Sequence, residues 1–298
     1  MARITDTIFV KMNERFIEWL LTNPHFSRRS VVHTPLKAAT ALGIGYSISE
    51  TAKFIFPDDE KFGYFEDIDK KTKDLLSQFS PLAIAHRGGN SPQHLEMSKM
   101  ASINYVEADV RSYRGKLSVS HGDSPPSPII DYGLRFLGID RSVPQVSEII
   151  KASALSNQGL LLDLKEKSAD GVIRVVDDHG LSNRTAYTGE WTALDRIAEK
   201  TKKTSNLFYA IETQAHLERF IDEQRTRTAQ GVSLHFALAK EDIVQTLRTR
   251  QVLKVFVYGA DYSDEIIPTL EAGADAIISG NLGVLAVWRK KESEPLLV

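Results

Sequence analysis

The sequence contains no cysteine among its 298 residues. This absence excludes disulfide bonds, thiolate zinc sites and cysteine nucleophiles. No apolar run reaches the roughly 18 residues of a transmembrane helix, and the stretch that comes closest, residues 38–49, is short and flanked by Lys37 and Glu50. Charge of one sign is not in excess either, because 37 Lys and Arg residues face 39 Asp and Glu residues. We therefore expect no nucleic-acid partner.

The N-terminus lacks the apolar core of a signal peptide. Lys11, Glu14, Arg15 and Glu18 interrupt the positions that such a core would occupy. We therefore expect a cytoplasmic protein, with export by a route that needs no signal peptide left open.

Residues 1–80 carry helical patterns. Apolar residues recur at helical spacing over residues 8–21, a second candidate helix spans residues 36–56, and a third apolar stripe spans residues 65–79. We interpret residues 1–80 as an N-terminal helical extension that packs on the following domain. The alternative is a docking element, with peripheral membrane contact through residues 1–80.

Residues 81–298 alternate between short β-rich runs and helical stretches, a pattern that indicates βαβ units and a parallel sheet. The β-rich runs are residues 82–85, 105–110, 117–120, 160–164, 185–188, 207–211, 232–238, 253–258 and 276–278, and the helical patterns are residues 93–102, 169–179, 192–202, 215–227, 240–250 and 263–272. Residues 117–120 follow the previous run too closely for a crossover helix, so we expect a hairpin or a continuation there. The eight remaining strands predict an α/β fold, a TIM-type (β/α)8 barrel, with a doubly wound open sheet as the alternative.

In such a barrel, residues at the carboxyl ends of the strands face the active site. Glu107 and Asp109 leave the same face of a strand because they are two residues apart, and Asp163 and Lys165 repeat this spacing. The candidates at strand ends are His86, Arg87, Glu107, Asp109, His121, Asp163, Lys165, Glu190, Glu212, His235 and Tyr258.

Carboxylates on one inner face are unfavourable unless a positive charge compensates them. A divalent cation held by Glu107, Asp109 and Asp163 would provide that charge, and oxygen ligands favour Mg²⁺ or Ca²⁺ over zinc. Taken alone, Glu107 and Asp109 also fit a solvated strand face, and Asp163 with Lys165 also fits an internal salt bridge.

Cations and histidines lie at the same predicted strand ends. Arg87 and Lys165 would bind an anion such as phosphate. His86 and His121 are residue types that donate and accept protons near neutral pH. Metal ligands, cations and a histidine pair together favour phosphoryl transfer, although a single histidine at a strand end is more commonly a hydrogen-bonded structural residue.

These residues lie in motifs that resemble a known family. "IAHRGG" at residues 84–89, "VEADV" at 106–110 and "KLSVSH" at 116–121 resemble the signature of the glycerophosphodiester phosphodiesterase family, which belongs to the phospholipase-C-like phosphodiesterase barrels. "VFVYGAD" at 255–261 and "LEAGADAIISGN" at 270–281 resemble its last two strands. The resemblance covers about residues 82–288 in order.

The resemblance implies a TIM-type barrel over residues 81–298 and metal-dependent cleavage of phosphodiesters. By position it assigns acid–base catalysis to His86 and His121, metal binding to Glu107, Asp109 and Asp163, phosphate contact to Arg87 and Lys165, and the substrate pocket to Tyr258. The implied cofactor is one divalent cation, Mg²⁺ or Ca²⁺, and the implied partner is a small phosphodiester or a lysophospholipid.

The sequence departs from the family pattern at several places. Residues 92–95 read PQHL where the family has P-E-N-T, residues 279–280 read SG where it has T-D, and Asp163 stands at a position that is usually glutamate. Residues 121–123 read HGD where the family commonly has H-D. These departures leave the substrate open.

Three alternative functions therefore remain at the level of sequence. Some features are similar to the sphingomyelinase D relatives, so a sphingomyelinase D-like or lysophospholipase D-like activity is one alternative. A sugar-phosphodiester transferase is another, because water, a hydroxyl of the substrate and a second substrate would all serve as attacking groups. The third is a phosphodiester-binding barrel without catalysis.

Overall fold

The computed structural model describes residues 68–103, 105–113, 116–119, 144–156, 158–165, 170–201, 206–223 and 229–288. All of these residues belong to one compact unit. The strands are β1 Leu82–Ala85, β2 Tyr105–Tyr113, β3 Lys116–Val119, β4 Gly159–Leu164, β5 Thr185–Gly189, β6 Leu207–Ile211, β7 Gly231–His235, β8 Lys254–Tyr258 and β9 Ala276–Ser279. The α-helices are α4 Lys70–Leu76, α5 Pro92–Met100, α7 Val146–Ser156, α8 Asp170–Asp178, α9 Trp191–Thr201, α10 Gln214–Asp222, α11 Glu241–Thr249, α12 Ser263–Glu271 and α13 Leu282–Leu285.

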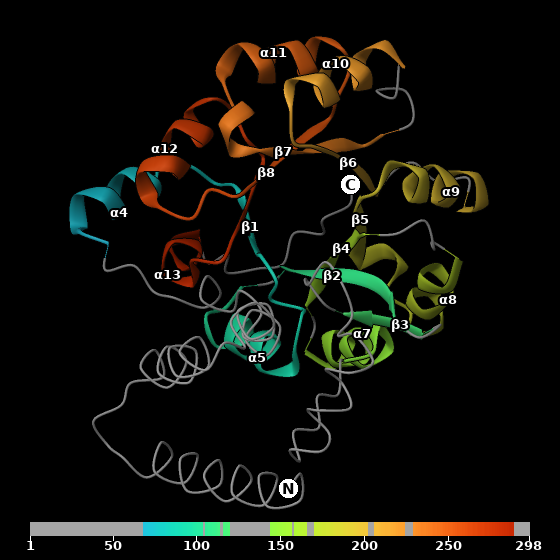
Figure 1. Ribbon diagram of the computed structural model, residues 1–298. Coiled ribbons are helices and arrows are strands. Elements are labelled where there is room, and N and C mark those ends of the chain that lie inside the picture. The colour runs from blue at the N-terminus through green and yellow to red at the C-terminus, as the bar shows by residue number, and fades with distance from the viewer. Residues whose placement is uncertain are drawn as a thin grey trace, which may run out of the picture. The chain divides into compact units, whose positions relative to one another are not determined.

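Eight parallel strands close into a barrel with helices around it (Figure 1). Around the barrel the strands follow the order β1, β9, β8, β7, β6, β5, β4, β2, and β1 also pairs with β2. Ile84 of β1 pairs with Ile278 on one side and with Tyr105 on the other. This closure confirms the predicted TIM-type barrel and rules out the doubly wound open sheet.

The ninth strand, β3, lies outside the parallel ring. It pairs antiparallel with the end of β2, with Val119 opposite Val110. Of the two possibilities expected for this segment, a hairpin or a continuation, the structure shows the hairpin, and it extends β2 beyond the barrel.

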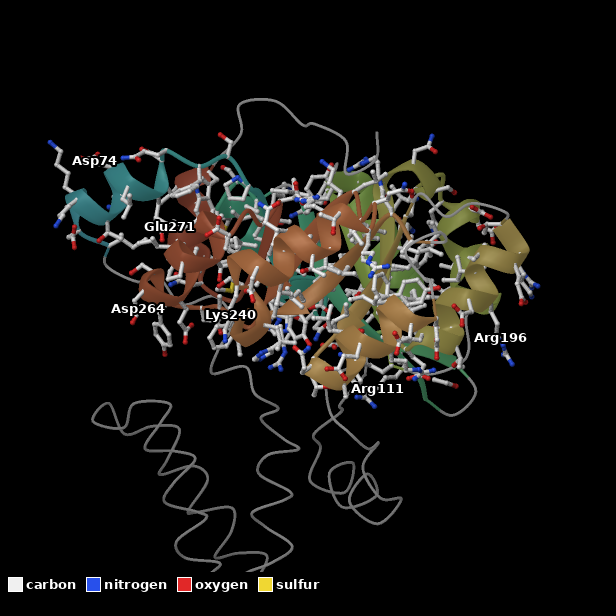
Figure 2. The ribbon with its side chains drawn as sticks, turned by 90° about the horizontal axis from the view of Figure 1, so that it is seen from above. Asp74, Arg111, Arg196, Lys240, Asp264 and Glu271 are labelled. Atoms are coloured by element: carbon white, nitrogen blue, oxygen red, sulfur yellow. The ribbon has the colours of Figure 1, made fainter. Side chains whose placement is uncertain are left out.

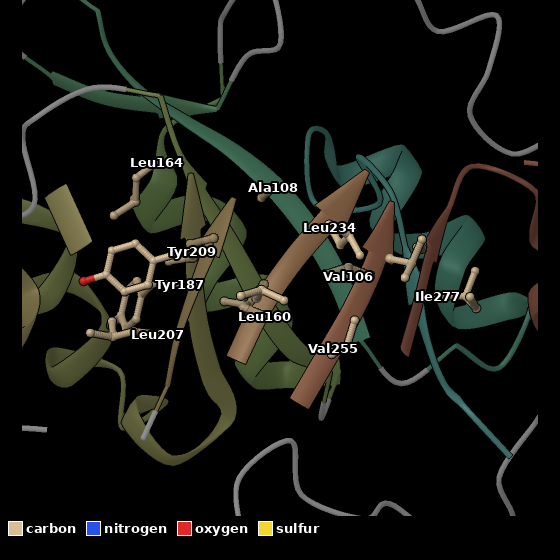
Figure 3. Packing of buried hydrophobic residues seen from close by; sticks show 14 of the residues in the cluster. Val106, Ala108, Leu160, Leu164, Tyr187, Leu207, Tyr209, Leu234, Val255 and Ile277 are labelled. Atoms are coloured by element: carbon tan, nitrogen blue, oxygen red, sulfur yellow. The ribbon is translucent and has the colours of Figure 1, made fainter. Parts of the chain in front are cut away.

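Alternate residues of the strands face the interior of the barrel and the surrounding helices. The outward set packs between the strands and the helices (Figure 3), and it includes Val106, Ala108, Leu160, Leu164, Tyr187, Leu207, Tyr209, Leu234, Val255 and Ile277. A separate inward cluster contains Ile84, Tyr105, Leu161, Ala186, Phe208, Phe256, Ala276 and Ile278. Because side chains alternate along a strand, Glu107, Asp109 and Asp163 belong to the inward set.

The inward cluster fills the barrel below the carboxyl ends of the strands. The rings of Phe208 and Phe256 stack with their centroids 3.9 Å apart. Gly231 of β7 is the register partner of Phe208 on β6 and of Lys254 on β8, and a Cβ at this position would lie 2.8 Å from the Phe208 ring. The absence of a side chain at Gly231 thus leaves room for the Phe208 ring of this stack.

Several helical segments differ from the sequence prediction, and the short helix α13 is one for which no helix was predicted. The helix α7 was not predicted, although Val146, Ile149 and Ile150 bury one face of it. The strand predicted over residues 232–238 ends at His235, and residues 236–238 form a 3₁₀ turn. The turn begins there because the main-chain N–H of Ala237 donates to Nδ1 of His235.

The N-terminal helix α4 packs on the barrel beside α12 (Figures 1 and 2). Leu76 is fully buried, and its carbonyl oxygen accepts a hydrogen bond of 2.8 Å from Nε1 of Trp288. Helix α4 lies inside the stripe predicted over residues 65–79, whereas the two earlier predicted helices lie outside the described residues.

Charged side chains lie on the outer surface of the helical layer. Figure 2 shows Asp74, Arg196 and Asp264 at its rim, and all three are exposed.

Across the part of the chain that the structure describes, every helix falls short of the length and apolar character that a bilayer-spanning helix requires.

Candidate active site

Three carboxylates meet at the carboxyl ends of β2 and β4. Glu107, Asp109 and Asp163 each offer an oxygen that lies within 4.8 Å of the others. Asp109 and Asp163 are partners in the β2–β4 register, and Glu107 precedes Asp109 on the same inner face. The spacing read from the sequence therefore does bring these three residues together.

Two of the carboxylates are almost fully buried. Glu107 is 3% exposed and Asp109 is 1% exposed. Oε1 of Glu107 is buried and has no hydrogen-bond partner among the described residues. A buried anionic oxygen without a donor is unfavourable, so this atom fits a cation ligand better than a structural role.

The loop after β1 holds this cluster from one side. Arg87 has φ of +58°, and its main-chain N–H donates a hydrogen bond of 2.6 Å to Oε2 of Glu107. The N–H of Gly89 donates to the carbonyl oxygen of Glu107 at 2.8 Å. At Gly88 a Cβ would lie 2.8 Å from the Cβ of Ala85, so glycine allows the close turn. The "HRGG" segment thus acts through its backbone to position Glu107.

Asn90 positions the second carboxylate. Its Nδ2 donates to Oδ2 of Asp109 at 2.7 Å, and its Oδ1 accepts from the main-chain N–H of Asp109 at 2.8 Å. Asn90 was not among the predicted site residues. The only signal for it in the sequence is a polar residue in the loop after a barrel strand, where active-site residues concentrate.

Lys165 lies against the same carboxylates. Its Nζ is 2.9 Å from Oδ1 of Asp109 and donates a hydrogen bond to Oδ2 of Asp163. Burial would lower the pKa of Lys165, but the charges of Asp163, Asp109 and Glu107 raise it above its ordinary value. The internal salt bridge considered from the sequence is therefore present, and the lysine stays charged.

Burial and mutual repulsion raise the pKa of two carboxyl groups. For Glu107, burial is the largest cause, followed by the charges of Asp109 and Asp163, and its pKa lies well above the usual range. For Asp163, burial raises the pKa, Lys165 opposes the shift, and Asp109 adds to it. Both groups would ionise more readily beside a bound cation.

His86 stands at the end of β1 beside the carboxylate cluster. Its main-chain N–H donates to the carbonyl oxygen of Ser279 at 2.9 Å, and its Nε2 lies 4.0 Å from Oε2 of Glu107. The side chain is 26% exposed, so the imidazole reaches solvent at the mouth. The second predicted histidine, His121, lies outside the described residues.

An aromatic wall faces the mouth from β7 and β8. His235 and Tyr258 are partners in register, and their rings contact edge to face with centroids 5.3 Å apart. The Oη of Tyr258 is buried without a hydrogen-bond partner among the described residues. Burial, then Glu212 and Asp163, raise the pKa of Tyr258, so its hydroxyl stays protonated. Tyr258 therefore offers an uncharged hydrogen-bond donor at the position predicted for the substrate pocket.

The remaining strand-end candidates contribute less. Glu190 is exposed and accepts a hydrogen bond from Oγ1 of Thr192 at 3.1 Å. Glu212 is also exposed after β6, and its charge reaches Asp163 and Tyr258. Arg87 has a half-buried side chain, and its predicted contact with phosphate stays a prediction.

Comparison with solved structures links this fold to one group of enzymes. A protein from Silicibacter pomeroyi that is named as a glycerophosphoryl diester phosphodiesterase matches with a TM-score of 0.59 at 16% sequence identity. The match covers 72% of this chain and 96% of that chain. An Oleispira antarctica phosphodiesterase, in complex with the product sn-glycerol-3-phosphate, matches with a TM-score of 0.55 at 17% identity, over 72% and 98%. A glycerophosphodiester phosphodiesterase from Parabacteroides distasonis matches with a TM-score of 0.53 at 18% identity, over 68% and 93%.

These likenesses establish the fold. No family model matches the sequence. No curated protein matches it either. The barrel expected from the resemblance to glycerophosphodiester phosphodiesterases is thus confirmed, at sequence identities of 20% or less for these three structures.

Proposed function

We propose that this protein cleaves small phosphodiesters of the glycerophosphodiester class and depends on a divalent cation. The observation that carries the proposal is the convergence of Glu107, Asp109 and Asp163 next to His86 at the mouth of the barrel. The fold shared with glycerophosphodiester phosphodiesterases supports the same reaction class.

The carboxylate cluster fits a hard divalent cation such as Mg²⁺ or Ca²⁺. All three donors are carboxylate oxygens, and Oε1 of Glu107 is the buried oxygen that lacks a donor among the described residues. Gly189 packs closely against the cluster, because a Cβ at this position would lie 2.4 Å from Oδ1 of Asp163. A cation bound here would supply positive charge to a non-bridging oxygen of the substrate phosphate.

Lys165 sets the charge of this site. Its ammonium group neutralises one of the three carboxylates, and a divalent cation would balance the other two. The loaded site would then carry no net charge from these groups, so an anionic phosphodiester would not be repelled. Lys165 also holds Asp109 and Asp163 in fixed positions through its two contacts.

Proton transfer is assigned to the histidine pair. His86 lies at the mouth with its imidazole partly exposed, where it can exchange a proton with the attacking hydroxyl or with the leaving alkoxide. We assign the opposite transfer to His121, on the strength of its place after the β3 strand in the sequence. Tyr258 and Arg87 would contact the substrate beside them.

The direct test is a panel of phosphodiesters with products identified by phosphorus NMR. The panel contains glycerophosphocholine, a lysophospholipid, sphingomyelin and a sugar phosphodiester, each with Mg²⁺, Ca²⁺ or EDTA. We expect turnover of a glycerophosphodiester that EDTA abolishes. A cyclic phosphate product would identify a hydroxyl of the substrate as the attacking group, and a monoester would identify water.

Two results would contradict the proposal. Full turnover in EDTA would remove the cation from the reaction. Binding of phosphodiesters in the presence of either ion, with no turnover of any of them, would indicate a non-catalytic barrel.

Flotation of the intact chain with liposomes tests the proposed peripheral membrane contact of residues 1–80.

A further inference from the structure

Thr188 is a buried residue of the barrel mouth with an unusual hydroxyl group. It is the penultimate residue of β5, and its register partners are Asp163 on β4 and Phe208 on β6. Ala186, two residues earlier, belongs to the inward cluster, so the side chain of Thr188 also faces the interior. Thr188 therefore stands beside the carboxylate cluster, one strand further around the barrel.

The hydroxyl of Thr188 has no hydrogen-bond partner within the described part of the chain. The residue is 4% exposed, and its Oγ1 is buried. Thr185, at the start of the same strand, is a direct comparison: it is fully buried, and its Oγ1 donates to the carbonyl oxygen of Leu181 at 3.0 Å. Because an unsatisfied buried hydroxyl is unfavourable, a valine of the same shape would suit the free protein better at position 188.

The positions next to Thr188, towards the carboxyl ends of β5 and β6, carry small residues. Gly189 follows it with φ of +105° and carries no side chain where a Cβ would meet Asp163. Ala210, two residues beyond Phe208 on the inner face of β6, is small and partly exposed. Neither position therefore adds a bulky side chain beside Asp163 and Thr188.

We propose that Oγ1 of Thr188 donates a hydrogen bond to an oxygen of the substrate phosphoryl group. This inference rests on the proposed function and adds a phosphate-binding residue to it. An anion bound at the carboxylate cluster needs donors that face the mouth, and Lys165 already donates to Asp163 and contacts Asp109. A hydroxyl supplies a donor without changing the charge of the site.

The test compares Thr188→Val, Thr188→Ser and the matched control Thr185→Val in the full-length chain. Binding of sn-glycerol 3-phosphate is measured by calorimetry at saturating Mg²⁺, Mg²⁺ affinity is measured separately, and stability is measured by urea unfolding. Thr188→Val is expected to weaken sn-glycerol 3-phosphate binding by about 10- to 100-fold, the range for a hydrogen bond to a charged group. Its Mg²⁺ affinity and its stability should be unchanged, or its stability should rise.

The other variants sharpen the comparison. Thr188→Ser keeps the hydroxyl and should bind sn-glycerol 3-phosphate within a few-fold of the wild type. Thr185→Val should lose stability, because it breaks the bond to Leu181, and should keep ligand binding. Loss of ligand binding in Thr188→Val and loss of stability in Thr185→Val would together show that the Thr188 hydroxyl binds the ligand and that the Thr185 hydroxyl is structural.

The outcomes separate this inference from the proposed function. Loss of stability in Thr188→Val, or an equal loss of Mg²⁺ affinity, would overturn the inference by assigning the hydroxyl a structural or ion-binding role. Failure of the wild type to bind sn-glycerol 3-phosphate would also overturn it. If the wild type turns over no phosphodiester but binds this ligand in a Thr188-dependent way, the proposed function fails and the inference is supported.

Discussion

At the scale of single residues, the imidazole of His86 lies close to the carboxyl group of Glu107. Nε2 of His86 lies 4.0 Å from Oε2 of Glu107, and that oxygen also accepts the main-chain N–H of Arg87. The imidazole is thus held near the Glu107 carboxyl group while it remains open to solvent on one side. A histidine in this position is suited to proton transfer with a molecule bound at the mouth.

The first prediction concerns the histidine pair. His86→Ala and His121→Ala should each lower kcat by about 10²- to 10⁴-fold, the usual contribution of a general acid or base, while the protein stays folded. His179→Ala is the control, because His179 lies after α8 with its Nδ1 2.9 Å from the carbonyl oxygen of Val175. Steady-state kinetics and circular dichroism check the result. More than about a tenth of the wild-type activity in either site variant contradicts the assignment.

The second prediction concerns pH and follows from Glu107. Its pKa in the folded protein is raised above the unfolded value of about 4.3, so the folded protein holds this proton more tightly. The contribution of this proton to the free energy of unfolding is fully present below the unfolded pKa. It is lost as pH rises through the raised pKa of Glu107 in the folded protein. In EDTA, the free energy of unfolding should therefore fall with pH over this window more steeply in the wild type than in Glu107→Gln.

A divalent cation should remove this difference. Ion binding displaces the proton from Glu107, so Mg²⁺ should stabilise the wild type increasingly as pH rises. Urea unfolding at a series of pH values, with EDTA or with Mg²⁺, measures both effects. Parallel pH profiles of the wild type and Glu107→Gln in EDTA would show that the Glu107 carboxyl is not shifted.

At the scale of elements, the loop between β1 and α5 connects the site to the helical layer. Ser91 caps α5 through a hydrogen bond of 3.1 Å from the N–H of His94 to its Oγ, and Pro92 occupies the first turn. Arg87 adopts a left-handed conformation in the same loop. The backbone conformation of the loop is thus set at both of its ends. This fixes the positions of the main-chain N–H groups that donate to Glu107.

The third prediction separates the backbone and side-chain roles of Arg87. Arg87→Gly suits the positive φ and keeps the N–H that donates to Glu107, so stability should change by no more than about 1 kcal/mol. If the guanidinium group binds phosphate, kcat/KM should fall by about 10-fold or more. Ser102→Gly is the control, since Ser102 has φ of +60° at an exposed position after α5 and should keep its activity. An active Arg87→Gly variant would limit Arg87 to its main-chain role.

At the scale of the whole molecule, closure of the barrel joins distant parts of the chain. Strand β1 pairs with β9 and with β2, so the loop after β1 lies next to both Glu107 and Ser279. Helix α4 adds a contact outside the ring, where Leu76 receives the hydrogen bond of Trp288 near the end of the described chain. The N-terminal and C-terminal ends of the described chain therefore stabilise each other.

The fourth prediction tests this contact. Leu76→Ala should lower the free energy of unfolding by about 2–5 kcal/mol, because Leu76 is fully buried, and should leave kcat unchanged. Lys73→Ala, at an exposed position of the same helix, is the control. Urea unfolding and a phosphodiesterase assay make the comparison. A loss of stability below about 1 kcal/mol would mean that α4 contributes little to the barrel.

Local patterns in the sequence were enough to predict the strands and the composition of the carboxylate cluster. Strand runs such as residues 160–164 are identified by their apolar residues, and a two-residue spacing places Glu107 and Asp109 on one face regardless of the rest of the fold. Eight such runs separated by helices predict a barrel, and the carboxyl ends of its parallel strands share one face.

The tertiary structure alone decided which groups at that face contact each other. Lys165 lies between Asp109 and Asp163, a salt bridge that the sequence left open beside the predicted phosphate contact, while Asn90 was not predicted although it makes two hydrogen bonds with Asp109. The hydroxyls of Thr188 and Tyr258 look ordinary in the sequence and are buried without partners among the described residues. These contacts depend on strand register and on closure of the ring, which bring together residues far apart in the chain. Hydrophobic periodicity records only which face a residue occupies, and so it carries no information about the partner across that face.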